Sequence, residues 1–245
     1  MTRRHFLALA GVAFGISCAN PTRPTAATSD GLLRARPGTP SPVVDPGEHR
    51  LDLATGSRDG LLYVPPSGAA RPAPLVVMLH GTGGVAADVD FTYPLADRFG
   101  IIILTPESRS RTSDAILGQF GPDVDFIDRA LAQTFSRCAV DPGRLSMGGF
   151  SDGASYALGL GLVNGDLFTH VIAFSPGFIP EGERLGRPKV FISHGTNDGV
   201  LPVEASRTIV SRLQANGYDV TYREFAGGHQ VPPDITHAAF EWFMN

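Results

Sequence analysis

The chain has 245 residues and a formal net charge of −4, so it can form one substantial core, and nothing in its charge indicates a nucleic-acid-binding surface. Charged residues make up only 18 % of the chain, whereas glycine (29) and proline (20) are abundant. This balance argues against a coiled coil or a disordered chain and predicts a compact, loop-rich globular domain.

The first 19 residues have the layout of an export signal. Two arginines, Arg3 and Arg4, precede an apolar run from Phe6 to Ile16, and small residues follow it. This run is too short to span a bilayer, which needs about 20 apolar residues. The segment TRRHFL at 2–7 resembles a twin-arginine signal, whose route exports folded proteins, and the alternative is an ordinary secretory signal with two unrelated arginines.

Cys18 raises the question of membrane attachment. Together with the three residues before it, Cys18 resembles a bacterial lipoprotein cleavage site, although Gly15 departs from the branched apolar residue expected there. The sequence predicts a protein exported to the periplasm or the medium, either free or anchored to the membrane through a lipid on Cys18. The folded domain then keeps one thiol, Cys138, which excludes a disulfide scaffold and is interpreted as a small packing residue.

Residues 20–48 are rich in Pro, Thr, Ser and Ala and are predicted to form a linker or a loosely attached arm. The folded domain is expected to span 49–245. It begins with two short predicted strands, HRLDL at 49–53 and LLYVP at 61–65, which the polar residues between them indicate as a hairpin.

Strands and helices then alternate along the chain. The uninterrupted apolar run at 75–79 predicts a strand buried on both faces. Helical spacing of apolar residues predicts a helix at 123–137, with Asp123 placed to cap it. Further strands are expected at 101–106, 144–150, 170–174, 189–193 and 220–225, and further helices at 88–99, 153–163, 204–216 and 234–243. The alternation predicts a mostly parallel sheet with helices on both faces and a functional site beyond the carboxyl ends of its strands.

The segment GFSDG at 149–153 falls between a predicted strand and a predicted helix. It matches the G-x-S-x-G nucleophile elbow, in which glycines allow a sharp turn that exposes the serine hydroxyl. Ser151 is therefore the candidate nucleophile, and the backbone N–H of Asp152 would point to a developing oxyanion. The alternative is a structural serine at the start of a glycine-rich helix.

The segment HGTGG at 80–84 follows the strand expected beside this elbow. The backbone N–H of Thr82 is the expected second oxyanion donor, with Gly81 as the next choice. A phosphate-binding loop is disfavoured because the G-K-[ST] ending is absent. His80 is interpreted as a structural residue that fixes this turn.

The expected acid and base follow later in the chain. Asp198 lies just beyond the strand 189–193, and Glu204 is a weaker choice because it begins a helix. His229 lies in the loop after the last strand, whereas His194 and His237 are interpreted as structural or surface residues. The order serine, aspartate, histidine is that of the α/β-hydrolases. The histidines form no zinc pattern, and this chemistry requires no metal or organic cofactor.

These segments resemble the serine esterases of the α/β-hydrolase superfamily, in particular the phospholipase/carboxylesterase family, which also contains acyl-protein thioesterase-like enzymes. The stretches SHGTNDGVLP and GYDVTYREFAGGHQVP carry the resemblance most clearly, and it covers about 60–245. The resemblance implies ester hydrolysis through an acyl-enzyme on Ser151. Asp152 stands where the family often has glutamine, and its carboxylate is expected to face away because it would otherwise repel the oxyanion.

The segment 175–188 is too short for a helical lid, which predicts an open cleft without a lid domain. Such a cleft favours a small-molecule or lipid ester, as in a short-chain carboxylesterase or a lysophospholipase-like esterase. Arg109 and Arg111 could contact an anionic headgroup, although a solvated polar loop is the preferred interpretation. An acyltransferase, a feruloyl esterase and a polyester depolymerase would use the same triad. A non-catalytic envelope binding protein is disfavoured by the intact serine, aspartate and histidine.

Overall fold

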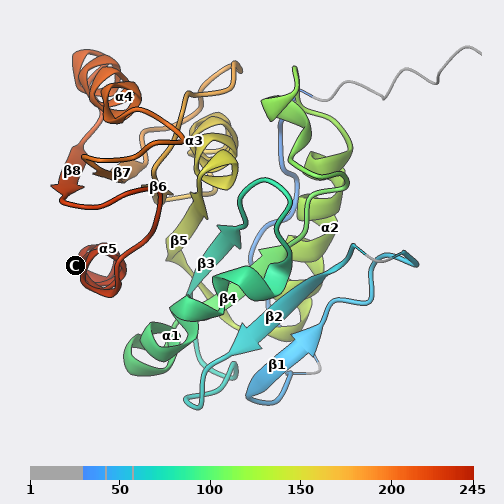
Figure 1. The fold of residues 1–245 in the computed structure, drawn as a ribbon. Coiled ribbons are helices and arrows are strands. Elements are labelled where there is room, and N and C mark those ends of the chain that lie inside the picture. Colours follow the sequence, from blue (N-terminus) through green and yellow to red (C-terminus); the bar gives the residue numbers. More distant parts are fainter. Residues whose placement is uncertain (1–29, 42, 57) are drawn as a thin grey trace, which may run out of the picture.

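The computed structural model describes residues 30–41, 43–56 and 58–245, in which an eight-stranded sheet runs through the middle of the molecule (Figure 1). The strand order is β1-β2-β4-β3-β5-β6-β7-β8. The strands are β1 (Gly47–Arg50), β2 (Gly60–Val64), β3 (Ala73–Leu79), β4 (Ile102–Pro106), β5 (Val140–Phe150), β6 (His170–Phe174), β7 (Lys189–Gly195) and β8 (Val220–Phe225). The helices are α1 (Tyr93–Phe99), α2 (Pro122–Arg137), α3 (Asp152–Val163), α4 (Val203–Ala215) and α5 (Pro233–Met244), with short 3₁₀ turns η1 (Ala86–Thr92) and η2 (Asp114–Ile116).

The sheet is parallel from β4 to β8, and only β1 and β2 at one edge pair antiparallel. The predicted hairpin is present, but its first strand ends at Arg50 and is followed by a nine-residue connection, 51–59. Buried Asp59 organises this connection, because its carboxylate accepts the N–H groups of Asp52 and Leu53 at 2.7 and 3.0 Å.

Successive residues of the central strands face opposite layers, as the pleat of a strand requires. On β3, Leu75 and Val77 pack into the layer that contains α2 and α3, whereas Val76 and Met78 pack into the layer of α1 and α5. Helix α4 joins α3 over β6 and β7. Figure 1 shows α1 and α5 away from α2 and α3, with the sheet between them. The predicted α/β architecture, a mostly parallel sheet with helices on both faces, is confirmed, and no helix interrupts 175–188.

Two local predictions were wrong. The helix expected at 88–99 is divided into η1 and α1, because Pro94 lies in the first turn of α1 and has no N–H to continue the preceding turn. Asp123 does not cap α2, whose N-cap is Gly121. The Asp123 carboxylate instead accepts the backbone N–H groups of Arg109 (2.5 Å) and Asp114 (2.7 Å), so it holds the loop before the helix.

The segment expected as a linker or loose arm at 20–48 packs along the domain over residues 30–41 and 43–46. Leu33 is 2 % exposed, and its N–H donates to the Asn164 side chain at 2.7 Å. Asp128 on α2 accepts the next two backbone N–H groups at 2.7 and 2.8 Å. These contacts use backbone donors, so the polar composition of the segment gave no sign of them. Residues 20–29 and the expected export signal at 1–19, with Arg3, Arg4 and Cys18, lie outside the described residues.

In the described part of the chain, no helix combines the length and the apolar character needed to cross a membrane. Cys138 is fully buried in the layer of α2, and this burial raises the pKa of its thiol to about 11. It serves as a packing residue, in agreement with its interpretation from the sequence.

His170, at the start of β6, is a buried titratable group far along the sheet from the elbow. It is 8 % exposed, and its ring meets those of Trp242 and Phe243 edge-on, with both centroid distances at 5.1 Å. Burial, and then the charge of Lys189, lower the pKa of His170 to about 4. The native protein therefore holds this imidazole neutral.

We predict that His170 makes the fold sensitive to mild acid. Between pH 6.5 and 4 the unfolded chain binds a proton at this position that the native state does not. The free energy of unfolding therefore decreases by about 3 kcal/mol as the pH is lowered through this range. In His170→Phe this part of the dependence should disappear, as measured by urea unfolding at pH 7.0 and 4.5. His237→Gln on α5 is the control and should keep the wild-type dependence. An unchanged dependence in His170→Phe would contradict the prediction.

Candidate active site

Ser151 stands at the junction of β5 and α3 in a conformation that few residues other than glycine adopt. Its φ is +57° and its ψ is −123°, and it is the N-cap residue of α3. Its backbone N–H donates to the carbonyl oxygen of Phe174, the last residue of the neighbouring strand β6, at 2.9 Å. This bond fixes the strained turn, so the hydroxyl is presented at the carboxyl edge of the sheet.

The two flanking glycines are required by the close approach of strand and helix. A Cβ atom on Gly149 would lie 2.3 Å from the backbone carbonyl of Gly153. A Cβ atom on Gly153 would lie 2.5 Å from the carbonyl oxygen of His80. Both distances are shorter than any real contact of a Cβ atom, so only glycine fits at either position.

The structure brings Ser151, Asp198 and His229 together from three separate loops. His229 Nε2 lies 2.8 Å from Ser151 Oγ, and His229 Nδ1 lies 2.6 Å from Asp198 Oδ2. The ring of His229 also packs on Phe150, with 4.7 Å between centroids. The imidazole therefore lies between the hydroxyl and the carboxylate with one ring nitrogen facing each.

Asp198 is held as a carboxylate by its loop. Its side chain is fully buried, and burial alone would raise its pKa. The N–H groups of Leu201 and Val200, which donate to Oδ1 at 2.9 and 2.8 Å, and the bond from His229 outweigh burial, so the pKa of Asp198 lies below its usual range. The competing acid, Glu204, is exposed in the first turn of α4, where it pairs with Arg207 at 3.1 Å.

The contact of His194 with the acid was missed in the sequence. His194 is fully buried, and its Nε2 lies 3.2 Å from Asp198 Oδ2 and 2.9 Å from the carbonyl oxygen of Leu201. Its Nδ1 lies 2.7 Å from Ser206 Oγ. It was interpreted as structural, and it does support the Asp198 loop. Its place four residues before the aspartate, at the end of a buried strand, was the available signal.

The 80–84 loop after β3 lies against the nucleophile. A Cβ atom on Gly81 would be 3.3 Å from the Cβ of Ser151. The N–H of Gly83, whose φ is +75°, donates to the carbonyl oxygen of Arg111 at 2.7 Å. In the described chain no backbone acceptor is paired with the N–H of Thr82. This amide is therefore available beside Ser151.

Residues 99–242 of the chain match the phospholipase/carboxylesterase family over more than half of its length. The chain belongs to this family. It is an esterase with the α/β-hydrolase fold, as the motifs and their order predicted.

This esterase is similar to other esterases in sequence and to solved esterase structures. It is 27 % identical over 242 residues to the putative esterase NocK of Nocardia uniformis subsp. tsuyamanensis, which covers 89 % of this chain and 70 % of that protein. It is 27 % identical over 192 residues to a probable feruloyl esterase C of Aspergillus oryzae, over 74 % of this chain and 68 % of that one. The crystal structure of esterase PE8 matches with a TM-score of 0.63 and 24 % identity, over 76 % of this chain and 98 % of that one.

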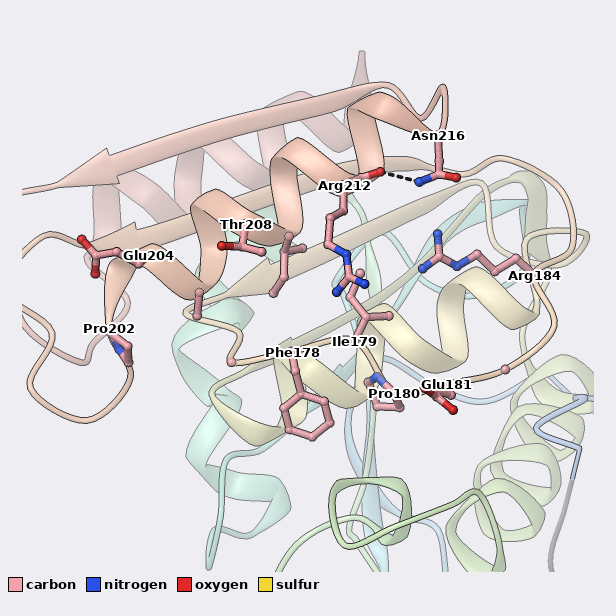
Figure 2. Close-up of a pocket in the computed structure, with 14 residues that line it drawn as sticks. Phe178, Ile179, Pro180, Glu181, Arg184, Pro202, Glu204, Thr208, Arg212 and Asn216 are labelled. Atoms are coloured by element: carbon pink, nitrogen blue, oxygen red, sulfur yellow. Dashed lines mark hydrogen bonds between the residues drawn. The ribbon is translucent and has the colours of Figure 1, made fainter.

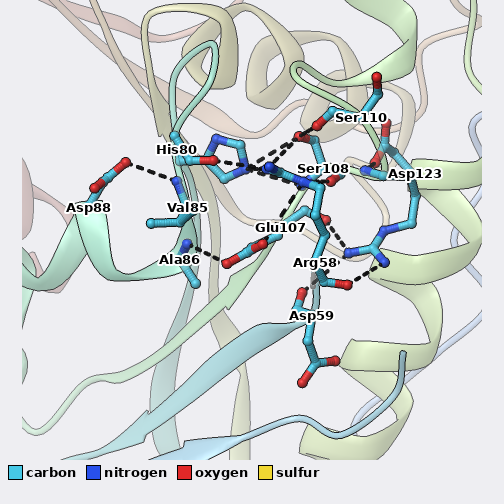
Figure 3. Close-up of polar contacts among 12 residues, drawn as sticks. Arg58, Asp59, His80, Val85, Ala86, Asp88, Glu107, Ser108, Ser110 and Asp123 are labelled. Carbon is cyan, nitrogen blue, oxygen red and sulfur yellow. Dashed lines mark hydrogen bonds and ion pairs between the residues drawn. The ribbon is translucent and has the colours of Figure 1, made fainter. Parts of the chain in front are cut away.

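In the esterase, a polar network around His80 fixes the peptide between Gly81 and Thr82 (Figure 3). His80 Nε2 accepts the N–H of Ser108 at 3.1 Å and lies 3.0 Å from the guanidinium of Arg58, so Nδ1 carries the proton that is donated to Gly81 O at 2.7 Å. Burial lowers the pKa of His80, and the charge of Arg58 acts in the same direction. Because a trans peptide directs its C=O and N–H to opposite sides, holding Gly81 O also sets the direction of the Thr82 N–H.

The expected orientation of Asp152 was wrong. Its side chain does not face away from the 80–84 loop: Oδ2 accepts the hydroxyl of Thr82, and it accepts the hydroxyl of Thr112 at 2.8 Å. The hydroxyls of Thr82 and Thr112 both donate to this carboxylate, and these bonds hold it against the 80–84 loop. The sequence separation between these residues, 70 and 40 positions, hid this contact from any local pattern.

The two arginines considered as headgroup ligands differ in role. The guanidinium of Arg109 donates to the carbonyl oxygens of Arg58 and Glu107 at 2.8 and 2.7 Å and lies 3.5 Å from the ring centroid of Phe126. It therefore belongs to the structure of the loop. Arg111 is exposed and contributes its carbonyl oxygen to the N–H of Gly83. Among the described residues, no group of three or more His, Cys, Asp or Glu side chains is arranged to hold a metal ion.

We predict that Gly149→Ala disrupts the elbow while its neighbour Gly148→Ala does so far less. The added methyl of Gly149→Ala meets backbone at 2.3 Å, whereas that of Gly148→Ala meets the flexible Met78 sulfur at 3.0 Å. Overpacking of this kind costs about 1–3 kcal/mol or more, and displacement of Ser151 should remove most ester hydrolysis. Thermal unfolding and p-nitrophenyl acetate hydrolysis measure both effects. Equal behaviour of the two variants would contradict the steric account.

Proposed function

We propose that the enzyme hydrolyses carboxylic esters through an acyl-enzyme on Ser151. The observation that carries this proposal is the continuous contact from Asp198 through His229 to Ser151 Oγ, with distances of 2.6 and 2.8 Å. His229 removes the hydroxyl proton as Oγ attacks the ester carbonyl, and Asp198 orients the ring and stabilises the imidazolium. The backbone N–H groups of Thr82 and Asp152 receive the negative charge that develops on the carbonyl oxygen.

The tetrahedral intermediate collapses when the bond to the alcohol oxygen breaks. The alcohol leaves with the proton that His229 took from Ser151, and the acyl group stays on Oγ. A water molecule then gives a proton to His229 and attacks the acyl carbonyl, and Oγ recovers the proton as the acid leaves. The imidazole thus returns to its starting state after each turnover.

A short-chain or lysophospholipase-like ester fits the surroundings of Ser151 best. The cleft lies at an edge of the sheet that no lid covers in the described residues. A cavity of about 960 Å³ lies between the loop after β6 and α4 (Figure 2). None of the three triad residues lines this cavity, but Gly177 does, and its N–H donates to Ser155 Oγ on α3 at 2.9 Å. Phe178 and Ile179 contribute apolar surface to this cavity, and charged side chains line it as well.

A feruloyl esterase is the second candidate, supported by the similarity to a probable feruloyl esterase C. An acyltransferase or a polyester depolymerase would use the same three residues with another acceptor or a polymer. Hydrolysis of methyl ferulate tests the feruloyl esterase, acyl transfer to an added alcohol tests the acyltransferase, and release of soluble products from a polyester film tests the depolymerase. A non-catalytic binding protein is disfavoured because a triad in hydrogen-bonding order has no purpose in such a protein.

We predict that Ser151→Ala lowers kcat at least about 10³-fold because no other group in the triad can carry the acyl intermediate. The assay uses p-nitrophenyl esters from acetate to palmitate and is paired with fluorophosphonate labelling. Ser211→Ala, an exposed serine on α4, should retain full activity and full labelling. Activity concentrated on short chains and lost with Ser151 supports the proposal. An active Ser151→Ala enzyme refutes it.

A further inference from the structure

One carboxylate oxygen of Asp152 joins three segments at the active site. Oδ2 accepts a hydrogen bond from Thr82 Oγ1 on the loop after β3 and another, at 2.8 Å, from Thr112 Oγ1 on the loop after β4. Asp152 is itself the first residue of α3, directly after Ser151. Thr112 is buried, with 7 % of its surface exposed, so this contact lies partly beneath the surface.

The 80–84 loop contains three glycines, so each hydrogen bond to it excludes conformations that its sequence would otherwise allow. Its sequence is His-Gly-Thr-Gly-Gly, so after His80 the Thr82 hydroxyl is its only side-chain hydrogen-bonding group. Glycine gives a backbone access to more conformations than any other residue. The Gly81 carbonyl is fixed by His80, and the N–H of Gly83, whose φ is +75°, is fixed by the carbonyl oxygen of Arg111. The bond from the Thr82 hydroxyl to Asp152 adds a side-chain restraint between these two backbone restraints.

We propose that the Asp152 carboxylate is a positioning residue that holds the two oxyanion donors at a fixed separation. This inference rests on the proposed function, since it concerns the same acyl transfer. One donor is the N–H of Asp152 and the other is the N–H of Thr82, and the side-chain bond between these two residues links them directly. A preorganised pair of donors stabilises the oxyanion without rearranging during the reaction.

The charge of Asp152 would by itself oppose the negative charge on the oxyanion. Two hydroxyl donors on Oδ2 reduce this opposition, because each hydrogen bond partly neutralises the carboxylate charge. Thr112 therefore has a purpose besides packing. Its buried hydroxyl gives the carboxylate a second anchor besides the more exposed Thr82.

The experiment compares kcat and KM for p-nitrophenyl acetate in paired variants. Asp152→Ala and Thr82→Val should each lower kcat about 10-fold or more, with KM changed less than about threefold, since one donor of an oxyanion hole is worth about 10²–10³ in kcat. The double variant should lose little more than either single one, because both remove the same bond. Thr82→Ser and Asp152→Asn, which keep a hydroxyl donor and an oxygen acceptor, should recover most of the lost kcat.

A purely structural role would not give this pattern. Affinity for a boronic acid that mimics the tetrahedral intermediate should fall with kcat across the variants. Asp90→Ala, which removes an exposed carboxylate on η1, is the control for the loss of charge. If Asp152→Ala does not fold, Thr112→Val and Thr82→Val carry the test, with folding followed by thermal unfolding.

Three results would overturn the inference. The first is a wild-type kcat in Asp152→Ala. The second is a rise in KM alone in that variant, which would make Asp152 a substrate ligand. The third is fully additive losses of kcat in the double variant. The proposed function fails separately, through an active Ser151→Ala enzyme. Slow hydrolysis in Asp152→Ala with normal stoichiometric fluorophosphonate labelling of Ser151 would support both.

Discussion

The close approach of β5 and α3 at Ser151 is the constraint on which the rest of the site depends. Gly149 and Gly153 leave no room for a Cβ atom, and Ser151 accepts a φ of +57° to complete the turn between them. Strain of this kind persists only where surrounding contacts over-determine it. Here the parallel sheet supplies them, since the N–H of Ser151 is bonded to the adjacent strand β6. The hydrophobic core thus fixes the nucleophile through backbone geometry.

The other functional groups are fixed in a different way. Asp198, His229 and Thr82 lie on loops, where hydrogen bonds to buried or half-buried groups take the place of the core. Each such bond adds little to stability, but it decides which of several loop conformations is populated. His80 and His194 have parallel roles, since each is buried at the end of a strand and supports the loop that follows.

The sequence predicted what local rules determine. Alternating apolar runs located the parallel strands, and the glycines around Ser151 marked the elbow, because both depend on residues adjacent in the chain. The sequence could not predict how Asp152 meets Thr82 and Thr112, or that residues 30–46 use backbone donors to bind α2, because these contacts join positions distant in the chain. The motif order predicted which residues meet in the triad, whereas hydrogen-bond directions required the structure.

No lid covers Ser151 in the described residues, which places a particular demand on this arrangement. In enzymes with a lid, closure excludes water and strengthens the electrostatic contacts around the reacting atoms. At a site that the described residues leave uncovered, the donors must already be fixed before the ester arrives, because water competes for them until binding. The peptide between Gly81 and Thr82 is restrained at both ends, because His80 bonds the Gly81 carbonyl oxygen and Asp152 accepts the Thr82 hydroxyl. On the proposed mechanism, rigidity of the 80–84 loop substitutes for closure, and the side chains of His80 and Asp152 provide it.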